Sequence, residues 1–297
     1  MNAKVKEAKI DRIFNAVNYT ILTLFFLTVL YPLVYIVSAS FSSTDAVISG
    51  KVWLWPVEPG LKGYRAVFEY NAIWTGFANS LFYTVAGTAV NVVLTIIAAY
   101  PLSRKDFIGR NAIMFIFVFT IMFSGGIIPN YLLVRDLGLL DTPWAMILPS
   151  AMSVFNVIIA RTYFQTTIPN EMLEAAQVDG CSDWKFLLKI VIPLAGPIIA
   201  VLTLFYAVSH WNSYFSALLY LKDRSLYPIQ LVLRTILIQN QIDPSMVTNE
   251  DDLIARQGLA DLLKYSLIVV ATAPMLIIYP FVQRHFVKGV MIGSIKG

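Results

Sequence analysis

The chain reads Glu174-Ala175-Ala176-Gln177-Val178-Asp179-Gly180 and, after a short gap, Ile190-Val191-Ile192-Pro193, between two segments that are almost entirely apolar. Pro169 precedes this stretch, and the first turn of a helix tolerates a residue without an N–H group. Glu171 adds negative charge near the positive end of the helix dipole. Gly180 supplies a permissive stop. The sequence therefore predicts a short polar helix that begins near Pro169 and ends at Gly180.

Spacing along this helix predicts one face that combines two alanines with larger groups. The positions i, i+3, i+4 and i+7 are occupied by Met172, Ala175, Ala176 and Asp179. Small residues allow another surface to approach closely. After the glycine, Ser182 is a candidate N-cap for a second helix, which Pro193 would interrupt or kink. We expect a helix, a turn and a second helix at a bilayer surface.

The composition is that of an integral membrane protein. Hydrophobic residues make up 58% of the chain and charged residues 13%, with a mean hydropathy of +0.68. Soluble proteins carry roughly 25% charged residues, and about 20 apolar residues suffice to cross a bilayer. We predict an all-α membrane protein with six transmembrane helices, at about 13–40, 77–102, 112–134, 144–160, 191–217 and 265–282.

Lys and Arg predict the orientation. Thirteen of the 22 basic residues fall in 1–12, 103–111, 161–192 and 284–297. By the positive-inside rule these segments are cytoplasmic, and so are both termini. The expected organisation is a cytoplasmic segment 1–12, a six-helix transmembrane domain 13–283 and a cytoplasmic tail 284–297. The transmembrane domain is expected to hold a cytoplasmic loop at about 165–192 and a long external loop at about 218–264.

The first apolar run has a second reading as a signal peptide, because Ser38-Ala39-Ser40 resembles a small-residue cleavage site. Its apolar run is too long for that, since the apolar region of a signal peptide spans only about 7–15 residues. We predict a retained transmembrane helix.

The polar stretch carries a family resemblance. The spacing of Glu174, Ala175, Ala176, Gly180, Ile190 and Pro193, with Asp179 before the glycine, resembles the EAA loop of bacterial ABC importer permeases. In that family the loop is cytoplasmic and docks on the ATPase subunit. Ile192 stands where Leu is commonest, and Cys181 where a small residue is usual. The resemblance implies the type I permease fold, with an EAA coupling helix formed by these residues.

Other motifs resemble the carbohydrate branch of the family, the maltose-type permeases, and within it the oligosaccharide permeases of Gram-positive bacteria. They are Asn79-Ser80, Ser103-Arg104-Lys105-Asp106-Phe107 with Gly109-Arg110, Leu137-Gly138-Leu139-Leu140-Asp141-Thr142, Trp211-Asn212 and Gly293-Ser294-Ile295-Lys296-Gly297. The resemblance implies a bacterial plasma (inner) membrane protein that forms a heterodimer with a second permease, binds two ATPase subunits and receives an oligosaccharide from an extracellular sugar-binding protein. An ABC permease for a peptide, amino acid or phosphate is the alternative.

Catalytic motifs are missing from the sequence. It has no G-x-x-x-x-G-K-[ST] loop, so ATP and Mg are expected on the partner subunits and not on this chain. His210 and His285 are far apart and outside any H-E-x-x-H motif, which argues against a metal site. The sequence contains no basic stripe interleaved with aromatic residues, the pattern that would predict nucleic-acid binding. We expect a transport subunit and not an enzyme; an intramembrane enzyme of unfamiliar type is the alternative.

A sugar path requires polar and aromatic groups that face the inside of the helix bundle. Asn and His can hydrogen-bond sugar hydroxyls, while Trp and Tyr offer flat faces to a pyranose ring. The candidates are Asn79, Tyr83, Asn91, Asn130, Tyr131, Asn156, His210, Trp211, Asn212 and Tyr214, of which the cluster from His210 to Tyr214 is favoured. The alternative is that these residues bridge helices or lie at the membrane interface.

Two external segments, 44–76 and 218–264, are predicted contacts for the binding protein, as the resemblance implies. For 218–264 the alternative is a solvated loop that covers the bundle. The resemblance also implies that the tail 284–297 reaches toward the ATPase. The alternative is that this tail is a flexible chain end.

Overall fold

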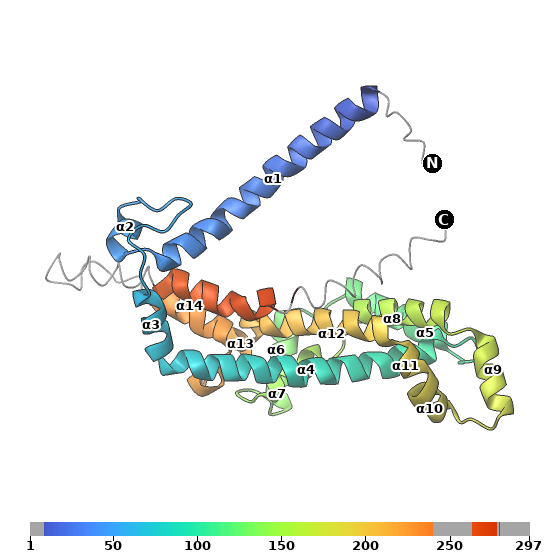
Figure 1. The fold of residues 1–297 in the computed structure, drawn as a ribbon. Helices are drawn as coiled ribbons and strands as arrows, with labels where there is room; N and C mark the ends of the chain where they lie inside the picture. The colour runs from blue at the N-terminus through green and yellow to red at the C-terminus, as the bar shows by residue number, and fades with distance from the viewer. Residues whose placement is uncertain (1–8, 240–262, 278, 280–297) are drawn as a thin grey trace. The chain divides into compact units, whose positions relative to one another are not determined.

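The computed structural model describes residues 9–239, 263–277 and 279, and these residues form helices and no strands (Figure 1). The predicted all-α class is thereby confirmed. The chain divides into two compact units, each described by itself. The first unit comprises Met1–Tyr70 and Thr235–Ala271, and the second comprises Asn71–Arg234 and Thr272–Gly297.

The first unit is built on α1 (Lys9–Phe41), followed by α2 (Thr44–Ile48) and α3 (Lys62–Glu69). Serines at the end of α1 fold the next segment back: the Ser38 hydroxyl donates to the Leu54 carbonyl oxygen at 2.6 Å, and Ser42 Oγ accepts from the Val57 N–H at 3.1 Å. The signal-like triplet 38–40 is therefore buried inside a helix. The predicted external loop 44–76 contains α2, α3 and the start of α4.

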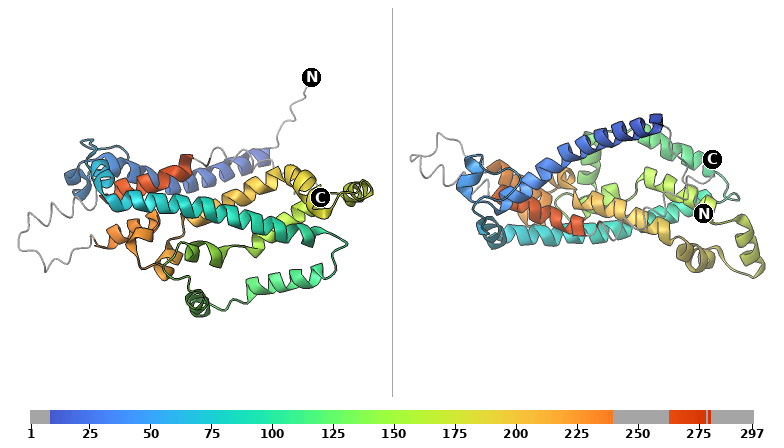
Figure 2. Two further views of the ribbon diagram at one scale, coloured as in Figure 1. Left: turned by 90° about the horizontal axis from the view of Figure 1, so that it is seen from below. Right: turned by 45° about the horizontal axis from the view of Figure 1, so that its top comes forward.

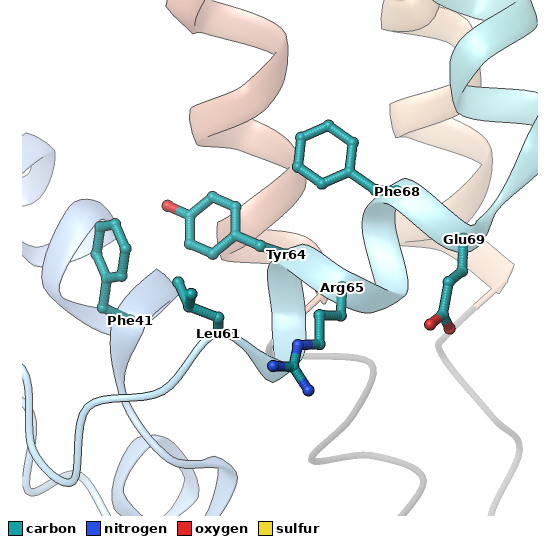
Figure 3. A pocket seen from close by; sticks show the side chains of 6 residues that line it. All are labelled: Phe41, Leu61, Tyr64, Arg65, Phe68 and Glu69. Carbon is teal, nitrogen blue, oxygen red and sulfur yellow. The ribbon is translucent and has the colours of Figure 1, made fainter.

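A pocket of about 590 Å³ opens between the end of α1 and α3 in this unit. Its lining residues are Phe41, Leu61, Tyr64, Arg65, Phe68 and Glu69 (Figure 3). The Tyr64 hydroxyl is 2.8 Å from Ser40 Oγ, and this contact joins α3 to α1. The pocket is mainly apolar, because four of its six lining residues are aromatic or Leu61. In Figure 3, Tyr64 and Phe68 lie on one side of α3, and Arg65 and Glu69 lie on the other.

The second unit contains most of the other helices. They are α4 (Asn71–Ser103), α5 (Arg110–Met122), α6 (Ile127–Asp136), α7 (Trp144–Ile147), η1 (Leu148–Ser150), α8 (Val154–Thr167), α9 (Asn170–Val178), α10 (Asp183–Phe186), η2 (Leu187–Val191), α11 (Ile192–Leu194), α12 (Gly196–Trp211), α13 (Tyr214–Tyr220) and η3 (Arg224–Leu226). Helix α14 (Ile229–Gln239) begins in this unit, and a further apolar helix covers Leu263–Ile277.

The core of the second unit lies where α4 packs against α12 and α8. Helices α4 and α12 run side by side, as the views in Figure 2 show. Leu202 of α12 and Ala160 of α8 are fully buried there. Gly87 permits the close approach, because a Cβ at this position would overlap the His210 ring of α12. Close packing of this kind is the main source of helix association in lipid.

Three of the predicted transmembrane runs are bent, which the apolar pattern did not indicate. α5 and α6 meet at 113°, the helix ending at Ser150 meets α8 at 54°, and the helix ending at Leu194 meets α12 at 79°. Among the described residues, only α1 and α4 are continuous helices that are long and apolar enough to span a membrane. If each bent pair is counted as one span, the number of candidate spans rises to as many as five. The helix Leu263–Ile277 covers the start of the sixth run, so the six-span count stays a prediction.

The first bend has a clear cause in the backbone. Gly126 has φ +86° and ψ −178°, a conformation open only to glycine, and it separates α5 from α6. Hydropathy depends on how many residues are apolar and not on the direction in which the backbone runs. The run 112–134 is therefore predicted as one continuous helix. The tail 284–297, the segment 1–8 and residues 240–262 of the long loop lie outside the described residues.

Candidate coupling helix and substrate path

Helix α9 forms where the sequence predicts a polar helix. Pro169 is the N-cap, one position before the first turn, and Glu171 lies in that turn. The helix ends in a Schellman motif: the Gly180 N–H donates to the Gln177 carbonyl at 3.0 Å, and the Cys181 N–H donates to the Ala176 carbonyl at 2.9 Å. Gly180 has φ +73°, so the predicted glycine stop is confirmed.

The two alanines of the motif lie on different faces of α9, which corrects the predicted face. Leu173 and Ala176 are each only 9% exposed and pack into the core of the second unit. Ala175 is exposed, because successive residues of a helix are about 100° apart. Met172 is exposed at 37%, and Asp179 is the C-cap.

The free face of α9 has its own regular spacing. Its exposed residues at i, i+3, i+4 and i+7 are Glu171, Glu174, Ala175 and Val178. Val178 is 88% exposed. We call these four residues the α9 stripe. It places two carboxylates beside a small and an apolar side chain, on a helix whose opposite side is anchored.

The second predicted helix begins at its predicted N-cap. The Ser182 side chain accepts a hydrogen bond from the Lys185 N–H at 3.4 Å, and α10 follows. The helix then widens into the π-helical turn η2, in which Ile190 is partly buried. Pro193 lies within α11, and the 79° bend follows Leu194 rather than Pro193. Pro193 lacks the N–H that would bond four residues back, and the wider turn before it accommodates that loss.

Arg104 links the end of α4 to the start of α10. Its Nε and Nη2 donate to the two Asp106 carboxylate oxygens at 2.8 and 2.6 Å, and its Nη1 donates to the Tyr100 hydroxyl at 2.9 Å. The same Nη1 lies 3.5 Å from Asp183 Oδ1 at the start of α10. Hydrogen bonding to Arg104 lowers the pKa of Asp106, and the same contact raises the pKa of Arg104.

A polar pocket of about 320 Å³ lies at the base of α9. Arg104, Lys105 and Arg110 line it together with Glu171 and Leu173 of α9 and Phe164 of α8. Arg110 Nη1 donates to the Arg104 carbonyl oxygen at 2.9 Å, which fixes the loop between α4 and α5. The motif 103–110 thus forms one wall of the pocket beside α9.

The favoured substrate-path cluster does not form a single surface. His210 and Trp211 are buried, with His210 Nε2 3.4 Å from Asn91 Oδ1 and the Trp211 ring 6.1 Å from Phe77. Asn212 donates back to the Val208 carbonyl within its own chain segment, at 2.8 Å. Tyr214 is exposed.

The other candidates occupy separate places. Asn79 Nδ2 donates to the Ser225 and Tyr227 carbonyls at 2.7 and 3.1 Å. The Tyr131 ring stacks on the Tyr220 ring, with the ring centroids 6.4 Å apart. Asn130 is exposed on α6, whereas Asn156 is buried on α8. Tyr83 is buried, and its hydroxyl donates to the Leu226 carbonyl at 2.8 Å. Several of these residues bridge segments, and their role in a sugar path stays a prediction.

The break before α8 is stabilised by polar residues of α4 and α12. Asn91 Nδ2 donates to the Ser150 carbonyl at 2.8 Å, and the Tyr206 hydroxyl accepts from the Ser153 N–H at 3.1 Å. Thr95 Oγ1 lies 2.6 Å from the Tyr206 hydroxyl. Backbone groups freed by a break inside a membrane need such partners. The sequence analysis did not identify Thr95 and Tyr206. They could have been found from their i, i+4 spacing, since Thr95 lies one turn from Asn91 and Tyr206 lies one turn from His210.

Asp141 joins the loop before α7 to the turn after α13. Its Oδ1 accepts from the N–H groups of Lys222 and Asp223, both at 2.8 Å, and its own N–H donates to the Tyr220 carbonyl at 2.9 Å. Asp141 adopts φ +59°, which only short polar residues and glycine tolerate well. Asp141 of the motif 137–142 therefore has a structural role, because it holds these two segments together.

Comparisons with known proteins agree with this architecture. The family model described as "Binding-protein-dependent transport system inner membrane component" matches residues 91–292. The polygalacturonan/rhamnogalacturonan transport system permease protein YtcP of Bacillus subtilis is 43% identical over 288 residues, covering 97% of this chain and 99% of that protein. Protein LplC of Bacillus subtilis is 40% identical, covering 97% of each chain.

A crystal structure of a bacterial ABC transporter involved in the import of the acidic polysaccharide alginate contains a similar chain. The TM-score is 0.85 at 37% identity, with 95% of this chain and 100% of that chain covered. The likeness extends through both units. This protein is therefore a multi-pass membrane protein and a transport subunit, not an enzyme, and it belongs to the binding-protein-dependent transport system inner membrane component family, the permeases of ABC importers.

Proposed function

We propose that this chain is a permease subunit of an oligosaccharide importer, in which α9 docks on an ATPase subunit and a second permease completes the translocation path. The observation that carries the coupling role is the α9 stripe. Helix α9 lies at one end of the second unit (Figure 1). Its stripe is exposed, while Leu173 and Ala176 anchor the same helix to the core. A partner that holds the stripe would move the core as well.

Coupling then follows from ATP binding on the partners. Closure of two ATPase subunits displaces α9, and the helices packed against it turn the path from inward-facing to outward-facing. ATP and Mg are held by the ATPase subunits. Both termini are cytoplasmic on this proposal, and the segments 44–76 and 218–264 face the extracellular binding protein.

The oligosaccharide class rests on the relatives. YtcP of B. subtilis is named for polygalacturonan and rhamnogalacturonan transport, and the solved transporter is involved in the import of the acidic polysaccharide alginate. A third relative, 27% identical, is an arabinooligosaccharide permease of Halalkalibacterium halodurans. These names favour sugar over a peptide, amino acid or phosphate. Uronate-containing oligosaccharides are the first substrates to test.

The test is sugar-stimulated ATPase activity of the complete importer in proteoliposomes, with binding protein present. The panel holds acidic and neutral oligosaccharides, with a dipeptide, an amino acid and phosphate as non-sugar solutes. Stimulation by an oligosaccharide of either kind supports the proposal. Stimulation only by a non-sugar solute would refute the substrate class.

The docking role has its own test. Glu174→Lys reverses a charge on the α9 stripe, and we expect at least a tenfold loss of ATPase co-purification, because an unpaired charge at an interface costs about 2 kcal/mol or more. Asp11→Lys, a reversal in the first turn of α1, is the matched control and should leave co-purification unchanged. Full retention of the ATPase by Glu174→Lys would rule out docking through the stripe.

A further inference from the structure

The guanidinium of Arg104 contacts three elements of the second unit. The Arg104 side chain is only 11% exposed, whereas the Asp106 and Asp183 side chains are 64% and 71% exposed. Tyr100, whose hydroxyl accepts from Arg104, belongs to the last two turns of α4. The charge is thus fixed in the protein and its two acidic partners face outward.

The two carboxylates bind Arg104 unequally. Asp106 takes a bidentate pair of hydrogen bonds at 2.8 and 2.6 Å, the geometry that best matches a guanidinium. Asp183 is held by one long contact of 3.5 Å, through a nitrogen that also donates to Tyr100. The first contact stays within one loop, and the second joins two segments 79 residues apart.

Asp183 is attached closely to the coupling helix. It is the first residue of α10 and follows the N-cap Ser182, and the turn before it is bound to α9 by the Cys181 N–H. A displacement of α9 is therefore transmitted through only four residues of backbone, 179–182, to the Asp183 carboxylate. On the other side, the Arg161 Nε–H donates to the Leu102 carbonyl at 2.9 Å and fixes the end of α4.

We propose that Arg104 is a positioning residue for transport, which ties the α9–α10 turn to the end of α4 through a releasable contact with Asp183. Asp106 keeps the guanidinium in place when Asp183 leaves. This inference rests on the proposed docking of α9, and it adds the route by which motion of α9 reaches the longest helix of the second unit.

The energetics favour a positioning role over a structural one. An ion pair whose carboxylate is exposed contributes little to stability, since water competes for both charges. Loss of the Asp183 contact should leave the fold intact and remove only the tether. Asp183→Asn should therefore lower the amount of sugar transported per ATP hydrolysed, at unchanged thermal stability.

The experiment uses the complete importer in proteoliposomes, with labelled uronate oligosaccharide uptake and ATP hydrolysis measured together. We expect Asp183→Asn to lower the transport-to-hydrolysis ratio at least fivefold with the ATPase still bound. Asp183→Glu, which keeps the charge, should restore the ratio to within twofold. The matched control is Asp136→Asn, which removes the carboxylate of an exposed pair with Arg135 at 2.8 Å and should change nothing.

A double variant tests the pair itself. If Arg104 acts through Asp183, the double variant Arg104→Gln/Asp183→Asn should have the same transport-to-hydrolysis ratio as Arg104→Gln alone, and not a lower one. A ratio within twofold of the unmodified importer in Asp183→Asn would overturn the proposal, as would a lowered ratio accompanied by a lower melting temperature. Failure of docking would look different, because it would appear as full ATPase retention by Glu174→Lys.

Discussion

Helices α1 and α4 are each 33 residues long and both strongly apolar. They differ in what covers them: none of the most apolar stretch of α1 is buried, whereas 39% of the corresponding stretch of α4 is buried. Helix α1 contains no glycine, and its buried polar residues are confined to Ser38 and Ser40 near its end. Helix α4 has glycines and buried polar residues along its length, namely Gly76, Ser80, Gly87, Thr88, Asn91 and Thr95.

The difference shows that hydropathy and packing are separate properties of a membrane helix. Lipid tails are as apolar as leucine, so apolar surface alone does not drive helices together. Small residues permit contact and polar residues need partners. In α4 Gly76 lies against the start of α14, where a Cβ would meet Val232 Cγ2 at 3.1 Å, and Ser80 Oγ accepts from the Ile229 N–H at 2.8 Å.

The largest effect is expected at the closest contact. Gly87→Leu would drive a side chain into the His210 imidazole and separate α4 from α12, at a cost of about 3 kcal/mol. Ala16→Leu, at an exposed position of α1, should cost nothing measurable. The measurement is the free energy of unfolding in mixed micelles. Equal values for the two variants would remove the distinction between the helices.

A cavity in the core gives the next largest effect. Leu202→Ala removes a fully buried side chain from α12 and should cost about 2 kcal/mol, mostly from lost contacts around the cavity. Leu24→Ala in α1 removes a side chain that is 61% exposed and should cost little. The same pair measured in the complete importer sharpens the comparison: a cost for Leu24→Ala there alone would mean that a partner subunit covers α1.

Sequence reasoning succeeded where one residue determines the local backbone. Gly180 ends α9 with positive φ, and Ser182 caps α10, because each residue type favours that conformation in almost any context. Those signals are local. The helix, its stop and the start of the next helix were therefore predictable without any tertiary information.

Sequence reasoning failed where the outcome depends on another segment. The burial of Ala176 and exposure of Ala175 depend on where the core lies, and the spacing alone did not show which face would be covered. The bend before α8 depends on Asn91 and Tyr206, which lie 59 and 53 residues from the groups they bind. A helical pattern read along one segment contains neither kind of information.

Asn91 offers a test of the polar contacts themselves. Asn91→Leu leaves the Ser150 carbonyl without its donor and removes the contact with His210, and we expect a loss of about 1.5 kcal/mol. Asn18→Leu in α1 replaces the same residue type at an exposed position and should be neutral or slightly stabilising. Unfolding in mixed micelles again measures both. A neutral Asn91→Leu would show that the contacts of Asn91 do not stabilise the break before α8.

The smallest expected effect compares two threonines. Thr95 is fully buried and its hydroxyl lies 2.6 Å from Tyr206, whereas the Thr28 hydroxyl donates to the Leu24 carbonyl of its own helix at 2.9 Å. Valine has nearly the same shape as threonine, so Thr95→Val removes the hydrogen bond without a cavity. Hydrogen bonds between membrane helices contribute about 0.6 kcal/mol on average, and we expect that loss for Thr95→Val and none for Thr28→Val. A double variant with Tyr206→Phe isolates the pair: if the two losses simply add, the hydroxyls do not stabilise each other, and this contact does not contribute to the contrast between α1 and α4.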